Sequence, residues 1–108
     1  MGVTKTQVFT AKQNRIADLA KAFSHPARVA IIQHLLKEKS CVCGDLVDVL
    51  PLAQATVSQH LKELKQIGIL RGEINPPRVC YCINEVVWRE TKAIFAGIFE
   101  EEVKPDCC

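Results

Sequence analysis

The sequence predicts a single, mainly α-helical domain with a small β-hairpin, built from about five helices and two to three short strands. Three observations support this prediction. A chain of 108 residues suits one domain, spanning residues 1–108, with one hydrophobic core. Apolar residues recur at helical spacing through most of the chain. Two segments with the composition of β-strands flank an Asn-Pro-Pro turn at residues 75–77.

Apolar spacing defines the first two helices. A helix is predicted over about residues 11–23, after an N-terminal arm of residues 1–10. Its apolar residues stand at positions i, i+3, i+4 and i+7, namely Ile16, Leu19, Ala20 and Phe23. Pro26 suits the first position of a second helix, because an N–H group there would lack a partner. That helix continues to about Glu38, with an apolar face of Val29, Ile32, Leu35 and Leu36.

A third and a fourth helix are predicted around a tight turn. Three apolar residues between positions 46 and 50 predict a short third helix, which Pro51 ends. After the turn at residues 51–53, a fourth helix is predicted over residues 54–67. Its inward residues are Val57, Leu61 and Leu64. Gly68 takes the position of the glycine that commonly follows a helix.

A hairpin and a last helix complete the domain. Residues 69–74 and 78–83 have the composition of two strands. Asn84 is a favourable N-cap for a helix over about residues 85–102. One side of this helix carries Val87, Thr91, Ile94, Phe95 and Ile98. Residues 103–108 form a short tail.

Helix, short turn, helix and then hairpin is the order of a winged helix-turn-helix. In that fold the second helix of the pair presents a polar face to the major groove of DNA, while apolar residues anchor its opposite face. Residues 54–66 meet both conditions. The candidate DNA-contacting residues are Gln54, Ala55, Thr56, Ser58, Gln59, His60, Lys62 and Lys65, with Arg78 where a wing meets phosphates. Residue types alone leave open an ordinary amphipathic helix with a solvated polar face.

Charge is unevenly distributed along the chain. Residues 1–83 carry 11 Lys and Arg against 6 Asp and Glu, whereas residues 84–108 carry 3 against 6. A basic body with an acidic tail suits a partner that presents phosphates to one face. The asymmetry is mild, so charge alone does not decide for nucleic acid as the partner.

Four stretches resemble the ArsR/SmtB family of metal-responsive repressors. They are residues 22–28 (AFSHPAR), 41–46 (CVCGDL), 55–64 (ATVSQHLKEL) and 68–70 (GIL). The resemblance extends over about residues 15–100. It implies a homodimer through the first and last helices, a palindromic DNA operator, and release of DNA when an inducer binds. The two recognition helices of such a dimer enter successive major grooves.

Two alanines depart from the family pattern, which often has serine at the positions of Ala53 and Ala55. Ala53 is a poor N-cap, which costs the fourth helix about 1 kcal/mol. Ala55 lacks a hydroxyl group that would contact DNA. The motif is preserved, while the details of base readout stay open.

Six cysteines form three close pairs: Cys41/Cys43, Cys80/Cys82 and Cys107/Cys108. Residues i and i+2 point about 200° apart in a helix, but they share a face in an extended segment. The first pair therefore grips one ion only if its segment is extended. The second pair lies in a predicted strand, with the opposite face formed by Val79, Tyr81 and Ile83. Because the segment entering the third helix lies beside the hairpin in winged-helix folds, we expect these two pairs to lie close together.

Thiolates select soft ions, so the cysteines predict a metal or metalloid site. Three thiolates suit As(III) or Sb(III), and four in a tetrahedral array suit Zn(II) or Cd(II). Cys41-Val42-Cys43 resembles the CVC motif of arsenic repressors, which favours arsenite as the inducer. A third cysteine often follows that motif where this chain has Leu46. The third thiol must then come from Cys80, Cys82 or the less favoured tail pair, in the same subunit or its partner. No obligatory cofactor is expected.

Other interpretations remain open. A repressor of the same fold could sense redox chemistry through disulfides or persulfides, and a constitutive DNA binder could hold a structural zinc ion. Sensors that bind metal through the last helix use Asp and His pairs there, and this helix has no histidine. The three histidines do not cluster with the cysteines in sequence and suit caps, helix surfaces or DNA contacts: His25, His34 and His60. A buried cysteine can also be a simple hydrophobe.

Catalysis and membrane association are not expected. No cysteine has a histidine and an acid at a recognisable catalytic spacing, so the chain is not expected to be an enzyme. The N-terminal segment lacks the apolar region of a signal peptide, and no apolar run approaches the roughly 20 residues of a membrane span. A cytoplasmic location with no membrane partner follows as an expectation.

Overall fold

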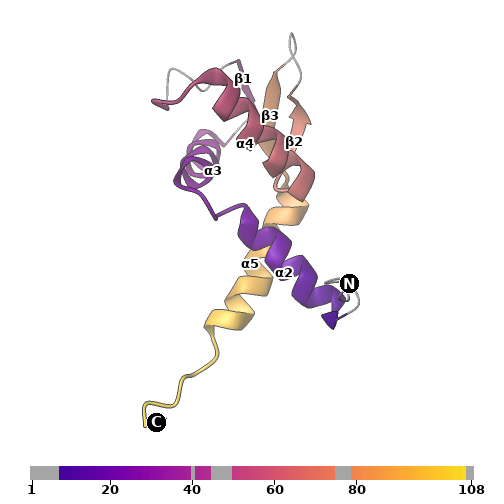
Figure 1. Ribbon diagram of the computed structural model, residues 1–108, viewed down its shortest axis with the longest axis vertical. Coiled ribbons are helices and arrows are strands. Elements are labelled where there is room, and N and C mark those ends of the chain that lie inside the picture. Colours follow the sequence, from indigo (N-terminus) through magenta and orange to yellow (C-terminus); the bar gives the residue numbers. More distant parts are fainter. Residues whose placement is uncertain (1–7, 40, 45–49, 75–78, 107–108) are drawn as a thin grey trace, which may run out of the picture.

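The computed structural model describes residues 8–39, 41–44, 50–74 and 79–106 (Figure 1). Within these residues the elements are α2 (Ala11–Lys21), α3 (Pro26–Glu38), β1 (Val42–Cys43), α4 (Gln54–Ile67), β2 (Leu70–Glu73), β3 (Cys80–Ile83) and α5 (Glu85–Phe99). The predicted short third helix, Arg78 and the tail cysteines fall outside the described residues, apart from Leu50. The described elements form a winged helix-turn-helix.

Capping chemistry explains where the helices begin and end. Thr10 and Gln13 form a capping box at the start of α2. Pro26 occupies the first turn of α3, as predicted, and Gly68 ends α4 in the left-handed conformation with φ of 105°. The Asn84 side chain accepts hydrogen bonds from two backbone N–H groups of α5, which confirms it as the N-cap. Ala53 makes no side-chain cap, as its methyl group predicts.

The three strands form one antiparallel sheet in the order β1-β3-β2. The predicted hairpin is confirmed as β2 and β3, and the extended cysteine segment adds β1 on the other side of β3. Gly72 faces Tyr81 across the hairpin with φ of 126°. A Cβ atom on Gly72 would lie 2.2 Å from the carbonyl oxygen of Cys80, so this close approach needs glycine.

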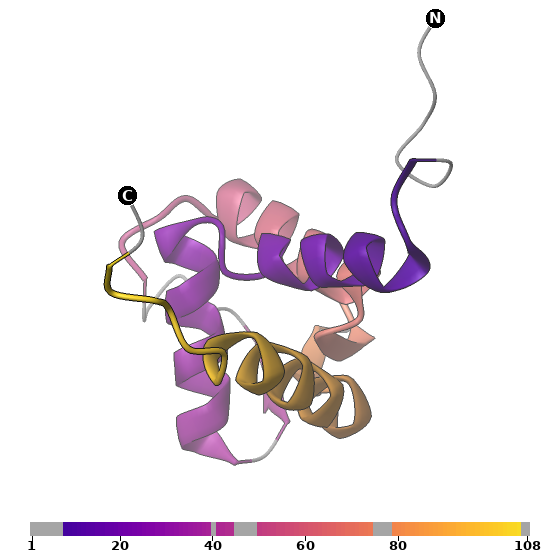
Figure 2. The same cartoon turned by 90° about the horizontal axis from the view of Figure 1, so that it is seen from below.

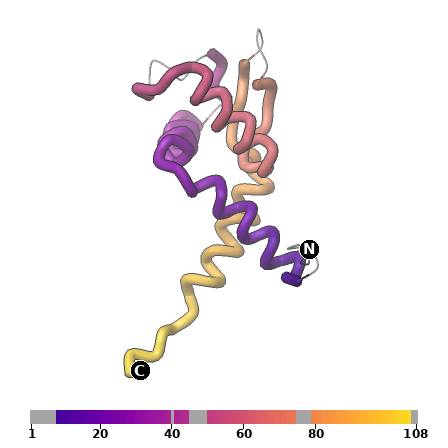
Figure 3. The backbone as a smooth tube through the Cα atoms, viewed as in Figure 1, coloured from indigo at the N-terminus to yellow at the C-terminus, as the bar shows by residue number. Residues whose placement is uncertain are grey.

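The core lies where α3 and α4 pack together and α4 covers β2 (Figure 3). Its buried members come from every described helix except α5 and from the hairpin: Leu19, Ala22, Ile31, Ile32, Leu35, Val57, Leu61, Leu64, Ile69, Leu70, Ile74 and Tyr81. The inward triad of α4 is therefore confirmed. Helices α2 and α5 pack against each other, and α5 continues away from the sheet (Figures 1 and 2).

Four residues predicted on inward apolar faces are instead exposed: Ala20, Phe23, Leu36 and Ile98. Periodicity identifies an apolar stripe, but the width that is buried depends on what packs against it. In α3, Ile31 is buried beside Ile32, so the buried stripe lies further round the helix than predicted. No helix among the described residues is long and apolar enough to cross a membrane.

Candidate nucleic-acid interface and cysteine site

Helix α4 has the two faces that DNA recognition requires. Val57, Leu61 and Leu64 are buried against the core and fix the helix by one side. The opposite side is exposed and offers amide, hydroxyl and ammonium groups, namely Gln54, Thr56, Gln59, Lys62 and Lys65, together with Ala55. Ser58 and His60 are only partly exposed. Arg78 lies outside the described residues, so the wing contact stays a prediction.

The carboxylate of Glu63 on α4 is paired with an arginine of α3. Glu63 forms an ion pair with Arg28 of α3 and accepts a hydrogen bond from Gln59 Nε2 at 3.1 Å. Arg28 is only 13% exposed, and its Nη1 also donates to the carbonyl oxygen of Lys21 at 2.8 Å. Arg28 therefore reduces the repulsion that Glu63 would exert on phosphates.

His60 is held by the same arginine. Arg28 Nε donates to His60 Nδ1 at 3.2 Å, and the His60 and His25 rings lie 4.6 Å apart. Nδ1 accepts a hydrogen bond, so this geometry requires the neutral ring. Burial lowers the pKa of His60, and His25 and Arg28 lower it further. Of the predicted DNA-contacting residues, His60 and Gln59 thus both have side chains that are hydrogen-bonded within the protein.

A second arginine ties the end of α4 to two other helices. Arg15 of α2 donates to both carboxylate oxygens of Glu90 on α5, at 3.1 and 2.8 Å. Its Nη1 donates to the carbonyl oxygen of Ile67, the last residue of α4, at 3.2 Å. The hydrogen bond from Arg15 lowers the pKa of Glu90. The orientation of α4 is therefore linked to α2 and α5.

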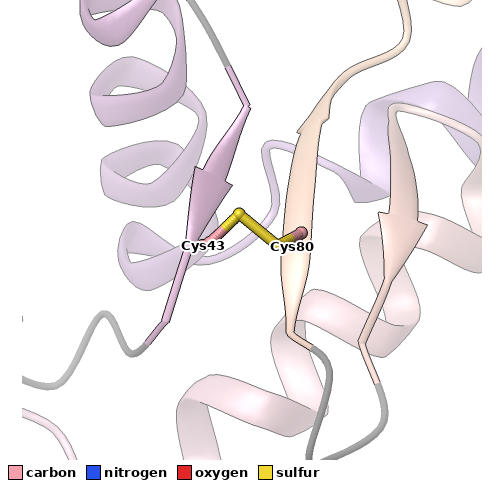
Figure 4. The surroundings of a disulfide bond; sticks show 2 residues. All are labelled: Cys43 and Cys80. Atoms are coloured by element: carbon pink, nitrogen blue, oxygen red, sulfur yellow. A yellow bond between two sulfur atoms is a disulfide. The ribbon is translucent and has the colours of Figure 1, made fainter.

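The sheet brings the two CxC pairs together. Cys43 and Cys80 are directly opposite each other on β1 and β3, with Cα atoms 4.0 Å apart, and are joined by a disulfide bond (Figure 4). One register step further along these strands, Cys41 comes opposite Cys82, and both thiols are free. The two pairs share a face of the sheet, because residues i and i+2 of a strand point the same way. Tyr81, between Cys80 and Cys82, is buried on the other face, as predicted.

The two free thiols differ in their environment. Cys41 is exposed, whereas Cys82 is buried. Burial raises the pKa of Cys82, and the neighbouring Cys41 raises it further, while Arg71 acts in the opposite direction. Cys82 therefore stays a thiol at neutral pH more readily than an exposed cysteine does.

Sequence reasoning found the cysteine cluster but missed the arginine contacts. Within the described ranges, no group of three or more His, Cys, Asp or Glu side chains is arranged to hold a metal ion, and Cys43 and Cys80 are engaged in their disulfide. The metal ligands thus stay a prediction for the reduced chain. The mutual contacts of Arg15, Arg28, Glu63 and Glu90 were not predicted, because a polar residue on an amphipathic helix looks solvated until its neighbours are known.

Helix α4 packs against α3 and is followed by the β2–β3 wing, an arrangement that defines a winged helix-turn-helix protein, while the first helix of the predicted helix-turn-helix pair lies outside the described residues. A family model described as a helix-turn-helix domain matches residues 23–73. The transcriptional regulator YgaV of Escherichia coli is 30% identical over 86 residues, which cover 79% of this chain and 87% of YgaV. The cadmium resistance regulator CadC homolog of Staphylococcus aureus is 34% identical over 86 residues, covering 77% and 70%.

The transcriptional repressor SmtB of Mycobacterium tuberculosis is 42% identical over 64 residues, 59% of this chain. That alignment spans 47% of the SmtB length, so the chain matches about half of this relative. The extent of the YgaV and CadC matches nevertheless shows the family. The chain belongs to the ArsR/SmtB family of helix-turn-helix transcriptional repressors, which are regulators and not enzymes.

Proposed function

We propose that this chain is a cytoplasmic transcriptional repressor that binds a palindromic DNA operator through α4 and is released by chemistry at its cysteines. The observation that best supports DNA binding is that α4 is buried on one side and polar on the other. Three buried leucine and valine side chains fix it, its outer face is polar, and Arg28 neutralises its carboxylate. Amide and ammonium groups on such a face read base edges and contact phosphates.

The DNA-binding form is a homodimer through α2 and α5. Phe99 is 77% exposed and stacks on Phe95, with ring centroids 6.0 Å apart. An apolar pocket beside them is lined by Ala20, Phe23, Thr91, Lys92, Phe95 and Phe99. A second copy of the same two helices would cover this surface, and the symmetric pair would match a palindromic operator.

The inducer is a soft metal or metalloid ion, As(III) or Sb(III) first, with Zn(II) or Cd(II) as alternatives. Reduction of the Cys43–Cys80 disulfide would leave four sulfur atoms on one face of two adjacent strands. Three of them would satisfy a metalloid, so this chain can supply the third thiol without a cysteine at position 46. The CadC relative of Staphylococcus aureus is named for cadmium resistance, which supports a soft metal ion as the inducer.

The cysteines can act on α4 through the chain itself. β1 lies between α3 and α4 in sequence, and it is paired with the wing strand β3. A ligand that changes how β1 sits against β3 therefore changes the position of α4 relative to the wing. A coupling free energy of about 1–3 kcal/mol would weaken operator binding about 5- to 150-fold.

The Cys43–Cys80 disulfide favours a second candidate, a repressor that senses thiol oxidation. In this form the reduced chain binds DNA and disulfide formation releases it. The fold and the DNA role are the same as in the first candidate, and only the inducer differs.

Operator binding measured by fluorescence anisotropy tests these proposals. Reduced protein is titrated onto DNA from upstream of its own gene, and then arsenite, zinc and a thiol oxidant are added separately. Release by arsenite that is lost in Cys41→Ser and in Cys80→Ser supports the metalloid inducer. Release by oxidant alone replaces the metalloid with redox chemistry. Absence of DNA binding by the reduced dimer would contradict the repressor itself.

A further inference from the structure

A groove of about 540 Å³ opens beside the two free thiols, a volume typical of sites for small molecules. Cys41 and Cys82 both line it, between the end of α3, the sheet and α5. Its apolar wall is formed by Leu35, Leu36, Ile83 and Trp88. The groove therefore offers both contact area and reactive sulfur.

The groove is cationic. Four of its lining residues are basic and one is acidic: Lys39, Arg71, Arg89, Lys92 and Glu85. The acidic residue lies 3.5 Å from Arg89, with which it forms an exposed ion pair. A concave surface with an excess of one charge concentrates ligands of the opposite charge.

The sheet register places one of these cations directly beside the thiols. Arg71 of β2 is the Cα partner of Cys82, which in turn faces Cys41. The neighbouring row of the sheet differs, because there Glu73 is the partner of Cys80. The free thiols thus lie next to a guanidinium group, and the disulfide lies next to a carboxylate.

We infer that this groove receives a small anionic disulfide, which oxidises Cys41 and Cys82 to a second cross-strand disulfide. The inference rests on the redox form of the proposed function, and it names the class of oxidant. The groove cations attract the anion, and the exposed sulfur of Cys41 reacts first. Cys82 comes opposite Cys41 in the strand register, lines the same groove and completes the reaction.

The reaction is two thiol–disulfide exchanges. Cys41 loses its proton to solvent, and its thiolate attacks one sulfur of the bound disulfide. A protein–ligand S–S bond forms, and the first ligand thiolate leaves. Cys82 then loses its proton and attacks the Cys41 sulfur, which expels the second ligand thiolate. Two protein thiols are oxidised, one small disulfide is reduced, and the two released thiolates take up the two protons.

The test compares disulfides that differ in charge. The probes are the dianion 3,3′-dithiodipropionate, the neutral bis(2-hydroxyethyl) disulfide and the dication cystamine. The chain carries Cys107→Ser and Cys108→Ser, so that the tail thiols do not contribute. Mass spectrometry after alkylation measures the rate of Cys41–Cys82 bond formation. Each rate is divided by the rate at which the same probe reacts with the free thiol of a cysteine peptide whose termini are blocked. Arg71→Gln is compared with Lys12→Gln, which removes an exposed charge outside the groove.

The normalised rate should be about tenfold higher for the dianion than for the dication at low salt. The difference should shrink at about 0.5 M salt. Arg71→Gln should slow the dianion several-fold relative to the neutral probe, whereas Lys12→Gln should leave this ratio unchanged. Equal normalised rates for all three probes, or a ratio insensitive to Arg71→Gln, would overturn the inference.

If all three probes also release operator DNA equally, the redox switch stands while its anion selectivity fails. If none releases DNA, the redox form of the proposed function fails separately.

Discussion

Arg28 Nε lies 3.2 Å from His60 Nδ1 and donates a hydrogen bond to it, which links α3 to α4. The same guanidinium group pairs with Glu63 and binds the carbonyl oxygen of Lys21. One side chain therefore joins the end of α2, the start of α3 and the middle of α4. The position of α4 therefore depends on the contacts of Arg28.

Replacing Arg28 should weaken both folding and DNA binding. Arg28→Met removes the arginine that binds Glu63 and His60, and the expected loss of stability in urea unfolding is about 1–2 kcal/mol. Operator affinity should fall about tenfold, because the carboxylate of Glu63 then repels phosphates. Adding Glu63→Gln should restore most of the affinity but not the stability. Arg89→Met, which removes an exposed i,i+4 ion pair, should cost less than about 0.5 kcal/mol. Equal effects of Arg28→Met and Arg89→Met would contradict this role.

Folding stability should decrease as the pH falls below about 6.5, the ordinary pKa of histidine. The pKa of His60 is lowered in the folded chain, so the unfolded chain binds more protons in this range. The stability from the neutral ring is present above the unfolded pKa and is lost as the pH decreases through the folded pKa. Urea unfolding between about pH 5 and 8 measures the slope. His60→Gln, whose amide oxygen can still accept from Arg28, should flatten it, and His34→Gln should leave the His60 contribution intact. A slope unchanged in His60→Gln would refute the assignment.

The hydrogen bonds that Arg15 donates to Glu90 and to the Ile67 carbonyl oxygen should stabilise the chain modestly. Arg15 and Glu90 are 33% and 39% exposed, so solvent screens their ion pair. Arg15→Met also frees the Ile67 carbonyl, and we expect a loss of about 0.5–1.5 kcal/mol in urea unfolding. Glu90→Gln should cost less, because the amide oxygen can still accept one of the two hydrogen bonds. A larger loss of unfolding free energy in Glu90→Gln than in Arg15→Met would contradict this role of Arg15.

The elements of this fold follow from local chemistry, and the long-range polar contacts do not. The bounds of α3 and α4 match the predicted residues because a proline and a glycine mark their ends. The last helix ends at Phe99, three residues before the predicted end at residue 102, where no glycine or proline fixes the boundary. The shared face of each cysteine pair followed from the two-residue period of a strand.

The partners of Arg15 and Arg28 could not be derived in the same way. Arg28 and Glu63 are 35 positions apart, and nothing in helical periodicity says which polar residue meets which. The exposed Phe23 and Ile98 were placed inward because an apolar stripe does not reveal whether its own chain or a second copy covers it. The disulfide between Cys43 and Cys80 required the register of β1 against β3, which depends on the tertiary fold.

Two glycine substitutions should have opposite effects. Gly72→Ala places a Cβ atom 2.2 Å from the Cys80 carbonyl oxygen at a φ of 126°, so the hairpin must shift. We expect a loss of about 2–3 kcal/mol in urea unfolding. Gly97→Ala is the matched control, because its Cβ meets no atom within 4 Å in α5. It should stabilise the helix by about 0.5–1 kcal/mol. Similar destabilisation by both variants would contradict the close approach at Gly72.

The N-terminus of α4 should gain stability from a side-chain cap. Ala53 already has the extended conformation of an N-cap, with φ of −65° and ψ of 146°, but its methyl group accepts no hydrogen bond. In Ala53→Ser the hydroxyl can accept from a backbone N–H in the first turn, which should add about 1 kcal/mol in urea unfolding. Ala96→Ser, inside the exposed part of α5, controls for the residue type and should be slightly destabilising. If Ala53→Ser gave no more stability than Ala96→Ser, the start of α4 would not be limited by its missing cap.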